Sequence, residues 1–189
     1  PDLTLEVYPV VADGLHNSNT DLIYWQDAFW LIHASSPWHL GSPECKLVLW
    51  RSEDAREWER VTTFDADGND IRDPTFAPIN GRLYLYVMIN EGVMATPFAT
   101  SMTSSADGRA WEPLREIEPE GWLFWRPKSL DGETWYCPAY WHEHGRSILL
   151  KSTDGATWEE VSEIHEGASN DETAIAFLPD GRMISTARL

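Results

Sequence analysis

The apolar residues of this chain occur in short runs or alternate with polar residues, and no stretch shows the spacing of an amphipathic helix. Tight-turn signals separate these runs. Asn80-Gly81, Asp131-Gly132 and Asp180-Gly181 lie between β-rich segments, and such pairs are the strongest short signal for a hairpin. Gln26-Asp27 stands at the corresponding place in the first segment. The pattern predicts an all-β chain built from hairpins.

A second motif recurs at intervals of about 50 residues. Its pattern is S-x-D-[GA]-x-x-W, and the copies span 52–58, 105–111 and 152–158. Each repeat therefore contains a strand, a tight turn, a strand, a loop, a strand, an S-x-D turn and a strand. A four-stranded antiparallel unit of ~40–50 residues is typical of a β-propeller blade. We predict one partial propeller domain over 1–189, with blades at about 15–64, 69–117, 121–165 and 168–189.

The residue types of the S-x-D turn favour a structural role. The Asp accepts hydrogen bonds from later backbone N–H groups, the Gly tolerates a left-handed backbone, and the Trp packs against the blade. These turns resemble the Asp-box (BNR) repeats of the sialidase-like β-propellers. The motif is one residue shorter than the commonest form, and Ala55 replaces the expected Gly in the first copy. The resemblance implies a propeller of the sialidase-like kind with five or six blades.

The number of repeats predicts about three and a half blades, whereas propellers typically close with 4–8. We expect the chain to be a fragment of a longer one. Completion of the ring by a partner, including self-association, is the alternative. Residues 3–11 are predicted to form the outer strand of a preceding blade.

The net charge of −17, from 14 Lys and Arg against 31 Asp and Glu, argues against nucleic acid and anionic membranes as partners. No apolar run approaches the ~20 residues that span a bilayer. Neither a cofactor nor a metal site is expected. Cys45 and Cys137 allow one disulfide or two thiols, and they do not fix the redox compartment. An extracellular or periplasmic location is slightly favoured over a cytoplasmic one.

Polar residues gather at the start of each predicted inner strand, where the ligand sites of propellers lie. Folding should bring these starts together at one mouth of the central channel. Carboxyl groups there can act as a general acid and as a base or nucleophile, and guanidinium groups bind carboxylates through two parallel bonds. The candidate catalytic residues are Asp21, Asp73 and Glu172. The candidate substrate-binding residues are His16, Asn19, Arg72, Trp125, Arg126, Lys128 and Asn170.

We therefore expect a glycan-acting glycoside hydrolase with a carbohydrate ligand; the alternative is a non-catalytic carbohydrate- or protein-binding propeller. The resemblance to sialidases implies an Arg triad, an Asp acid/base and a Tyr nucleophile assisted by Glu. The Arg-Ile-Pro motif of that family is absent, and no Tyr is assigned. Residues 72–76 with 81–86 also resemble five-bladed hydrolases of arabinans, fructans and mannosides, which need no Arg triad. Catalysis predicts carboxyl groups about 5–10 Å apart, whereas binding alone predicts that they pair with Arg or Lys.

Overall fold

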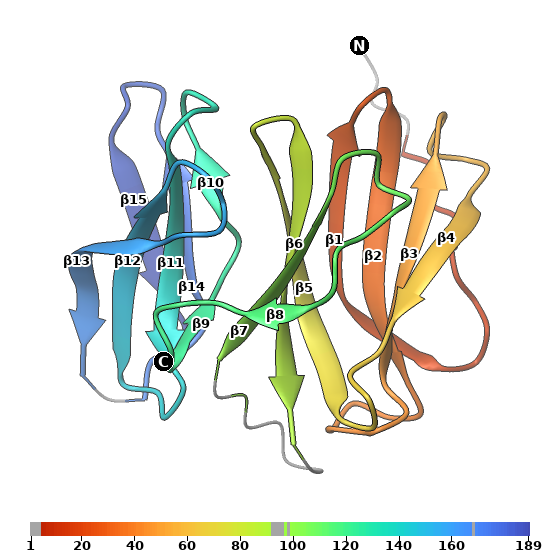
Figure 1. Cartoon of the computed structure of the whole chain (residues 1–189), viewed down its shortest axis with the longest axis horizontal. Coiled ribbons are helices and arrows are strands. Elements are labelled where there is room, and N and C mark those ends of the chain that lie inside the picture. The colour runs from red at the N-terminus through yellow and green to blue at the C-terminus, as the bar shows by residue number, and fades with distance from the viewer. Residues whose placement is uncertain (1–4, 92–96, 98, 168) are drawn as a thin grey trace.

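The computed structural model describes residues 5–91, 97, 99–167 and 169–189. Within this part of the chain there is no α-helix and every strand pairing is antiparallel, so the prediction of an all-β chain is confirmed. No helix of the described residues is long and apolar enough to cross a membrane. Figure 1 shows the strands standing in separate sheets.

The strands form four sheets in chain order, here called sheets 1 to 4. Sheet 1 contains β1 (His16–Trp25), β2 (Ala28–Ser36), β3 (Lys46–Ser52) and β4 (Glu59–Phe64). Sheet 2 contains β5 (Asp70–Ile79), β6 (Arg82–Asn90), β7 (Thr100–Ser105) and β8 (Arg115–Glu116). Sheet 3 contains β9 (Trp122–Phe124), β10 (Lys128–Ser129), β11 (Trp135–Trp141), β12 (Arg146–Ser152) and β13 (Glu159–Glu166). Sheet 4 contains β14 (Thr173–Phe177) and β15 (Met183–Ala187).

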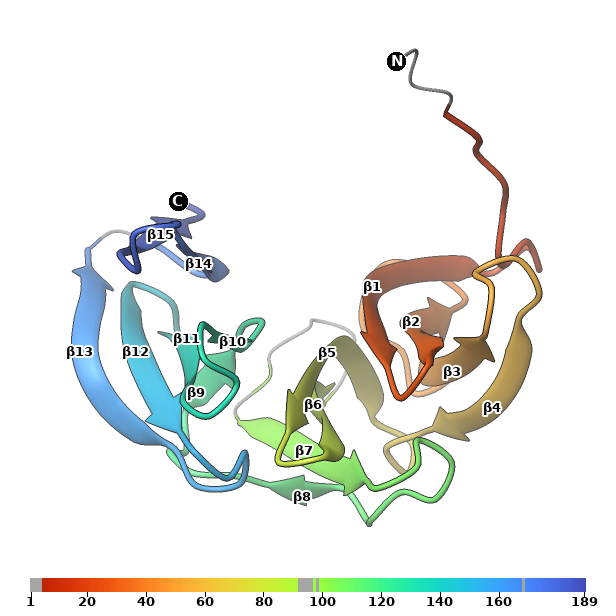
Figure 2. The same ribbon diagram turned by 90° about the horizontal axis from the view of Figure 1, so that it is seen from above.

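Figure 2 shows the sheets arranged along an arc, with sheets 1 and 4 at its two ends. The outer strands β4, β8 and β13 follow the convex side of the arc. Side chains alternate between the two faces of each strand, so a sheet can pack on a neighbour at either face. One apolar core between sheets 1 and 2 contains Trp30 and Leu85, and another between sheets 2 and 3 contains Tyr86 and Trp158.

The S-x-D turns are closed by hydrogen bonds of the kind that the motif predicts. In the second copy, Asp107 Oδ1 accepts the N–H groups of Arg109 and Ala110 at 2.8 and 2.9 Å. Ser105 Oγ accepts the N–H of Gly108 at 2.9 Å. The first and third copies repeat the two bonds to the Asp. The carboxylates therefore satisfy the backbone of their own turns.

A fourth copy of the motif, Ser129 to Trp135, lies in the hairpin between β10 and β11. The sequence analysis recognised only its Asp131-Gly132 pair. Asp131 Oδ1 accepts the N–H groups of Glu133 and Thr134 at 2.9 and 2.8 Å, as in the other copies. The motif is therefore a self-contained turn and does not mark one fixed position in a sheet.

The S-x-D turns of sheets 2 and 3 pack on the preceding sheet. A Cβ added at Gly108 would lie 2.2 Å from Cη2 of Trp30, and one added at Gly155 would lie 2.9 Å from Cδ1 of Ile79. At Gly132, in contrast, none of the described atoms comes within 4 Å of an added Cβ. Close contact between sheets therefore favours glycine at positions 108 and 155. The left-handed backbone, which Gly132 shares with them, favours glycine at all three positions.

Both cysteines are free thiols in separate cores. Cys45 is buried between sheets 1 and 2, and Cys137 is buried between sheets 2 and 3. Burial raises the pKa of Cys45 to about 11, so this thiol is protonated at neutral pH. The sequence left open one disulfide or two thiols, and the structure contains two separate thiols.

Candidate functional site

The inner strands are irregular where the predicted polar clusters lie. The register of β1 against β2 and that of β5 against β6 each shift within these clusters. Asn19 and Asp73 lie at these shifts with φ of 50° and 51°, and Arg126, just ahead of β10, has φ of 52°. Such bulges re-aim side chains, and left-handed non-glycine residues are typical of functional sites.

A pocket of about 330 Å³ lies where the inner strands converge, and all four sheets or their loops contribute to it. From sheets 1 and 2 and their loops it is lined by Asn19, His39, Arg72, Asp73, Met88, Asn90 and Pro97. From sheets 3 and 4 it is lined by Leu123, Tyr140, His142, His144, Asp171, Glu172 and Arg188. The structure thus brings residues from three of the four predicted clusters into one pocket, which we call the four-sheet pocket.

Asp73 is a mostly buried carboxyl group of the four-sheet pocket. Asn19 Nδ2 donates a hydrogen bond to its Oδ1. Burial raises the pKa of Asp73, and the bond from Asn19 and the charge of Arg72 only partly oppose this rise. A carboxyl group that keeps its proton to higher pH is suited to donate it as a general acid.

Glu172 enters the same pocket just before β14. Arg188 Nη1 donates to Glu172 Oε2 at 2.8 Å, and Nε of the same guanidinium donates to Asp171 Oδ1 at 2.8 Å. Burial raises the pKa of Glu172; the Arg188 charge opposes the rise, and the charges of Asp171 and Asp73 add to it. The two candidate carboxyl groups therefore interact electrostatically across the pocket.

Arg72 lines the pocket, but its guanidinium is bound within the protein. Its Nε and Nη2 donate to the two carboxylate oxygens of Asp70 at 2.5 and 2.8 Å, and its Nη1 donates to the His39 carbonyl at 3.1 Å. Asp70 also accepts bonds from the Ser42 N–H and the Asn90 amide. Burial alone would raise the pKa of Asp70, and these bonds together lower it. The sequence analysis missed Asp70, although its spacing of two residues from Arg72 puts both on one strand face.

Asp21 and Arg126 pair beside the four-sheet pocket and are not among the residues that line it. Arg126 Nη1 donates to Asp21 Oδ1 at 2.8 Å, and the Phe76 N–H donates to Asp21 Oδ2 at 2.7 Å. Asp21 and Lys128 line a separate pocket of about 270 Å³. Asp21 thus ties sheet 1 to sheet 2 and to the segment ahead of β10.

The remaining candidates surround the pocket. His16 Nε2 lies 3.1 Å from Nδ1 of His39, which is part of the lining. The rings of Trp125 and Tyr140 lie edge to face, with centroids 6.3 Å apart. Asn170 is fully buried, and its amide donates to a hydroxyl of β12.

Tyr140 is a pocket residue that the sequence analysis did not single out. It lies on β11, one strand outward from the inner strands that were searched. Its hydroxyl donates to Met88 Sδ at 3.7 Å. Burial raises the pKa of Tyr140, and the charges of Asp73 and Glu172 raise it further, so the phenol lies within the field of both carboxyl groups.

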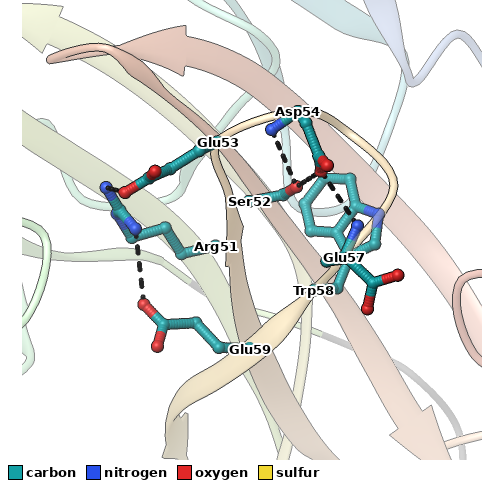
Figure 3. Close-up of a pocket in the computed structure, with 7 residues that line it drawn as sticks. All are labelled: Arg51, Ser52, Glu53, Asp54, Glu57, Trp58 and Glu59. Carbon is teal, nitrogen blue, oxygen red and sulfur yellow. Dashed lines mark hydrogen bonds and ion pairs between the residues drawn. The ribbon is translucent and has the colours of Figure 1, made fainter.

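Another pocket, of about 460 Å³, surrounds the S-x-D turn between β3 and β4 (Figure 3). Its one arginine is paired with acidic side chains: Arg51 lies 3.0 Å from Glu53 and 3.5 Å from Glu59. The Glu57 N–H donates to Asp54 Oδ1 at 2.9 Å, and such backbone bonds lower the pKa of Asp54. An ionised carboxylate held by its own turn is unsuited to acid catalysis, so the four-sheet pocket is the better candidate site.

The raised pKa of Asp73 predicts that its contribution to stability falls as the pH rises. That contribution is fully present below the ordinary pKa of 3.8 and is lost as the pH rises through the folded-state pKa. We expect Asp73→Asn to remove this loss, so the variant gains unfolding free energy relative to the wild type between about pH 4 and pH 7. Urea unfolding across this range measures the difference. Parallel pH profiles for the two proteins would show that burial does not perturb Asp73.

No protein-family model and no curated protein sequence matches this chain, whereas solved structures do. A Hadza microbial sialidase matches with a TM-score of 0.70 at 17% identity, over 91% of this chain and 42% of that one. An exo-beta-1,3-galactanase from Clostridium thermocellum gives 0.64 at 12% identity, over 85% and 40%. The GH93 alpha-L-arabinofuranosidase of Fusarium graminearum, in complex with arabinobiose, gives 0.66 at 12% identity, over 88% and 57%.

These neighbours are propeller folds of a sialidase and of other glycoside hydrolases. The resemblance to sialidase-like propellers is therefore confirmed at the level of the fold. This chain spans 42%, 40% and 57% of the three structures, about half of such a protein. At these identities the fold alone is shared, and function has to be argued from the site.

Proposed function

We propose that the four sheets are propeller blades and that the four-sheet pocket is the active site of a glycoside hydrolase. The observation that carries this proposal is the presence of Asp73 and Glu172 in one pocket, from different sheets, with both pKa values raised. A pair of carboxyl groups flanking the scissile bond is the usual apparatus of glycoside hydrolysis. The glycoside hydrolases among the structural neighbours support the same class.

In this proposal Asp73 is the general acid and Glu172 is the base. Asp73 donates its proton to the glycosidic oxygen while the bond from that oxygen to the anomeric carbon breaks. A water molecule attacks the anomeric carbon, and Glu172 accepts its proton. Arg188 holds Glu172 in place through the 2.8 Å bond and favours its ionised form. Asp21 is then a positioning residue, because Arg126 and a backbone N–H already occupy its oxygens.

The substrate class that fits best is an uncharged glycoside. All three nitrogens of Arg72 donate to Asp70 or to a backbone carbonyl, and all three of Arg188 donate to Asp171 or Glu172. Neither guanidinium presents the free two-bond edge that binds a substrate carboxylate. A carboxylate in this pocket would also meet the charges of the acidic residues. Arg126 lies outside this pocket and donates to Asp21 and to the Thr20 carbonyl. The carboxylate clamp expected of Arg72 and Arg126 is therefore not part of the proposal.

Glu172→Gln is expected to lower kcat/KM by about 100-fold, because the amide keeps the shape of the side chain but cannot accept a proton. The assay is a panel of fluorogenic arabinofuranosides, galactosides and sialosides. Asp73→Asn should slow substrates with poor leaving groups most, since a good leaving group needs no proton. Glu163→Gln, on exposed β13, is the matched control and should leave the rate unchanged.

Two results of this panel would contradict the proposal. If both variants hydrolyse the best substrate at the wild-type rate, the pair is not catalytic. If sialosides are hydrolysed faster than uncharged glycosides, the substrate class is wrong.

The second candidate function is a carbohydrate-binding propeller without catalysis. The pairing of Asp21 with Arg126 favours it, because one of the three candidate carboxylates is neutralised. Glycan binding by calorimetry, without turnover by the wild type and with affinity unchanged in Glu172→Gln, would support this candidate over the hydrolase.

A further inference from the structure

The hydroxyl of Tyr140 is held in the four-sheet pocket with only a weak acceptor. The residue lines the pocket and is 7% exposed. Among the described residues, the hydrogen-bond partner of its hydroxyl is Sδ of Met88, at 3.7 Å. A thioether sulfur is a weak acceptor, whereas the hydroxyl of a buried Tyr usually finds a full hydrogen-bond partner. The pocket therefore contains a donor whose hydrogen-bonding capacity is largely unused.

The position of Tyr140 is fixed from several sides. Its strand is paired on both edges at this point, with Leu123 of β9 and Ser147 of β12 opposite Tyr140. The ring packs in an apolar cluster with Met88 and Leu123. Sheet 3 stands between sheets 2 and 4 in the arc, so Tyr140 lies away from the two ends of the arc (Figure 2). A donor held in this way is oriented before a ligand arrives.

The charged donors of the pocket are already used within the protein. The guanidinium nitrogens of Arg72 and Arg188 all donate to carboxylates or to a backbone carbonyl. The Asn19 amide donates to Asp73. Tyr140 adds a neutral donor to these groups, and its only bond is one that a ligand oxygen can replace. The acidic surroundings favour an uncharged oxygen for this bond, and a sugar hydroxyl supplies one.

The phenol of Tyr140 stays protonated at neutral pH. Burial raises the pKa of Tyr140, and the charges of Asp73 and Glu172 raise it further. A phenolate here would lose hydration and face two carboxyl groups. The hydroxyl is therefore suited to donate a hydrogen bond. The Tyr nucleophile that the resemblance to sialidases implies needs the opposite property, an oxygen that is activated for attack.

We propose that Tyr140 is a specificity-determining residue of the hydrolase, whose hydroxyl donates a hydrogen bond to one hydroxyl oxygen of the sugar that is cleaved from the glycoside. This inference rests on the proposed function. The sugar hydroxyl replaces Met88 Sδ as the acceptor, and no covalent bond to Tyr140 forms. Asp73 and Glu172 keep the roles of acid and base. A sugar without that hydroxyl leaves a buried donor unpaired and is discriminated against.

Tyr140→Phe removes the hydroxyl and keeps the ring in its apolar cluster. With the best uncharged substrate of the fluorogenic panel, kcat/KM should fall about 30-fold, because the sugar hydroxyl loses its partner in a buried site. The pH profile of kcat/KM should keep its shape, since Tyr140 is neither the acid nor the base. Tyr136→Phe is the matched control on the same strand, where the ring packs edge to face on Phe177 of sheet 4. It should leave the rate unchanged.

Monodeoxy forms of the same substrate identify the contact. The wild type should lose about 30-fold in kcat/KM on the form that lacks the hydroxyl bound by Tyr140. Tyr140→Phe should lose little more on that form, because the interaction is already absent, and should show the wild-type losses on the other forms. A residue that only shapes the pocket gives additive losses on every form. Thermal melts check that each variant is folded.

The outcomes separate this inference from the proposed function. An unchanged kcat/KM in Tyr140→Phe, or additive losses on every deoxy form, overturns the role of Tyr140 while Glu172→Gln remains impaired. Complete loss of activity in a folded Tyr140→Phe, even on substrates with good leaving groups, makes Tyr140 the nucleophile and also overturns it. If Glu172→Gln hydrolyses at the wild-type rate, or the wild type hydrolyses none of the panel, the proposed function fails and this inference fails with it.

Discussion

Replacing Asp70 with Asn is expected to lower the free energy of unfolding by about 3–5 kcal/mol. The side chain of Asp70 is 0% exposed and that of Arg72 is 11% exposed. The substitution therefore leaves a guanidinium in the interior without its counter-charge, which costs more than the pair itself contributes. Denaturant unfolding at neutral pH measures the loss. The loss should shrink in acid, because the lowered pKa of Asp70 means that its stabilisation disappears as the pH falls.

Glu53→Gln is the matched control for this prediction. Glu53 also pairs with an arginine, Arg51, but its side chain is 75% exposed, so water replaces the contact. We expect a change within about 0.5 kcal/mol. Adding Arg72→Gln to Asp70→Asn removes both charges and should recover part of the loss. Equal effects of Asp70→Asn and Glu53→Gln would show that the Asp70–Arg72 pair is not desolvated.

The all-β fold was predictable because its signals are local. Each S-x-D turn is completed by hydrogen bonds among residues at most three positions apart, so the motif specifies its own geometry. The fourth copy, 129–135, matches the same pattern in full, and its Asp131-Gly132 pair also carries the signal of a hairpin turn. Packing between sheets was less visible in the sequence. The need for glycine at position 108 comes from Trp30, which lies far away in the chain.

The site was predictable in part because local signals also locate the starts of the inner strands. Asp73 and Glu172 were placed near one another because each lies at the start of an inner strand. Their partners did not follow from the sequence. Arg188 reaches Glu172 from beyond β15, and Tyr140 enters from β11. Which side chains meet there depends on register and on bulges, and a shift of one residue reverses the face of every side chain in a strand.

Gly108→Ala is expected to lower the free energy of unfolding by about 3 kcal/mol, from a left-handed backbone and from overpacking together. The added Cβ would lie 2.2 Å from Trp30, a ring that is 2% exposed and enclosed by the core. Gly132→Ala is the matched control, since Gly132 has the same motif and a φ of 80° but open space around the added Cβ. It should lose only about 1 kcal/mol, the backbone part.

The difference between these two variants isolates the contact between sheets 1 and 2. Trp30→Leu makes room at Gly108, so Gly108→Ala should be less harmful in that background than in the wild type. The double-mutant cycle measured by denaturant unfolding gives this coupling energy. Equal losses for Gly108→Ala and Gly132→Ala, or additive effects of Trp30→Leu and Gly108→Ala, would mean that the turn does not dock tightly on the preceding sheet. Docking of this kind is one of the contacts between neighbouring sheets, beside their apolar cores, so the cycle tests part of the arrangement on which the four-sheet pocket depends.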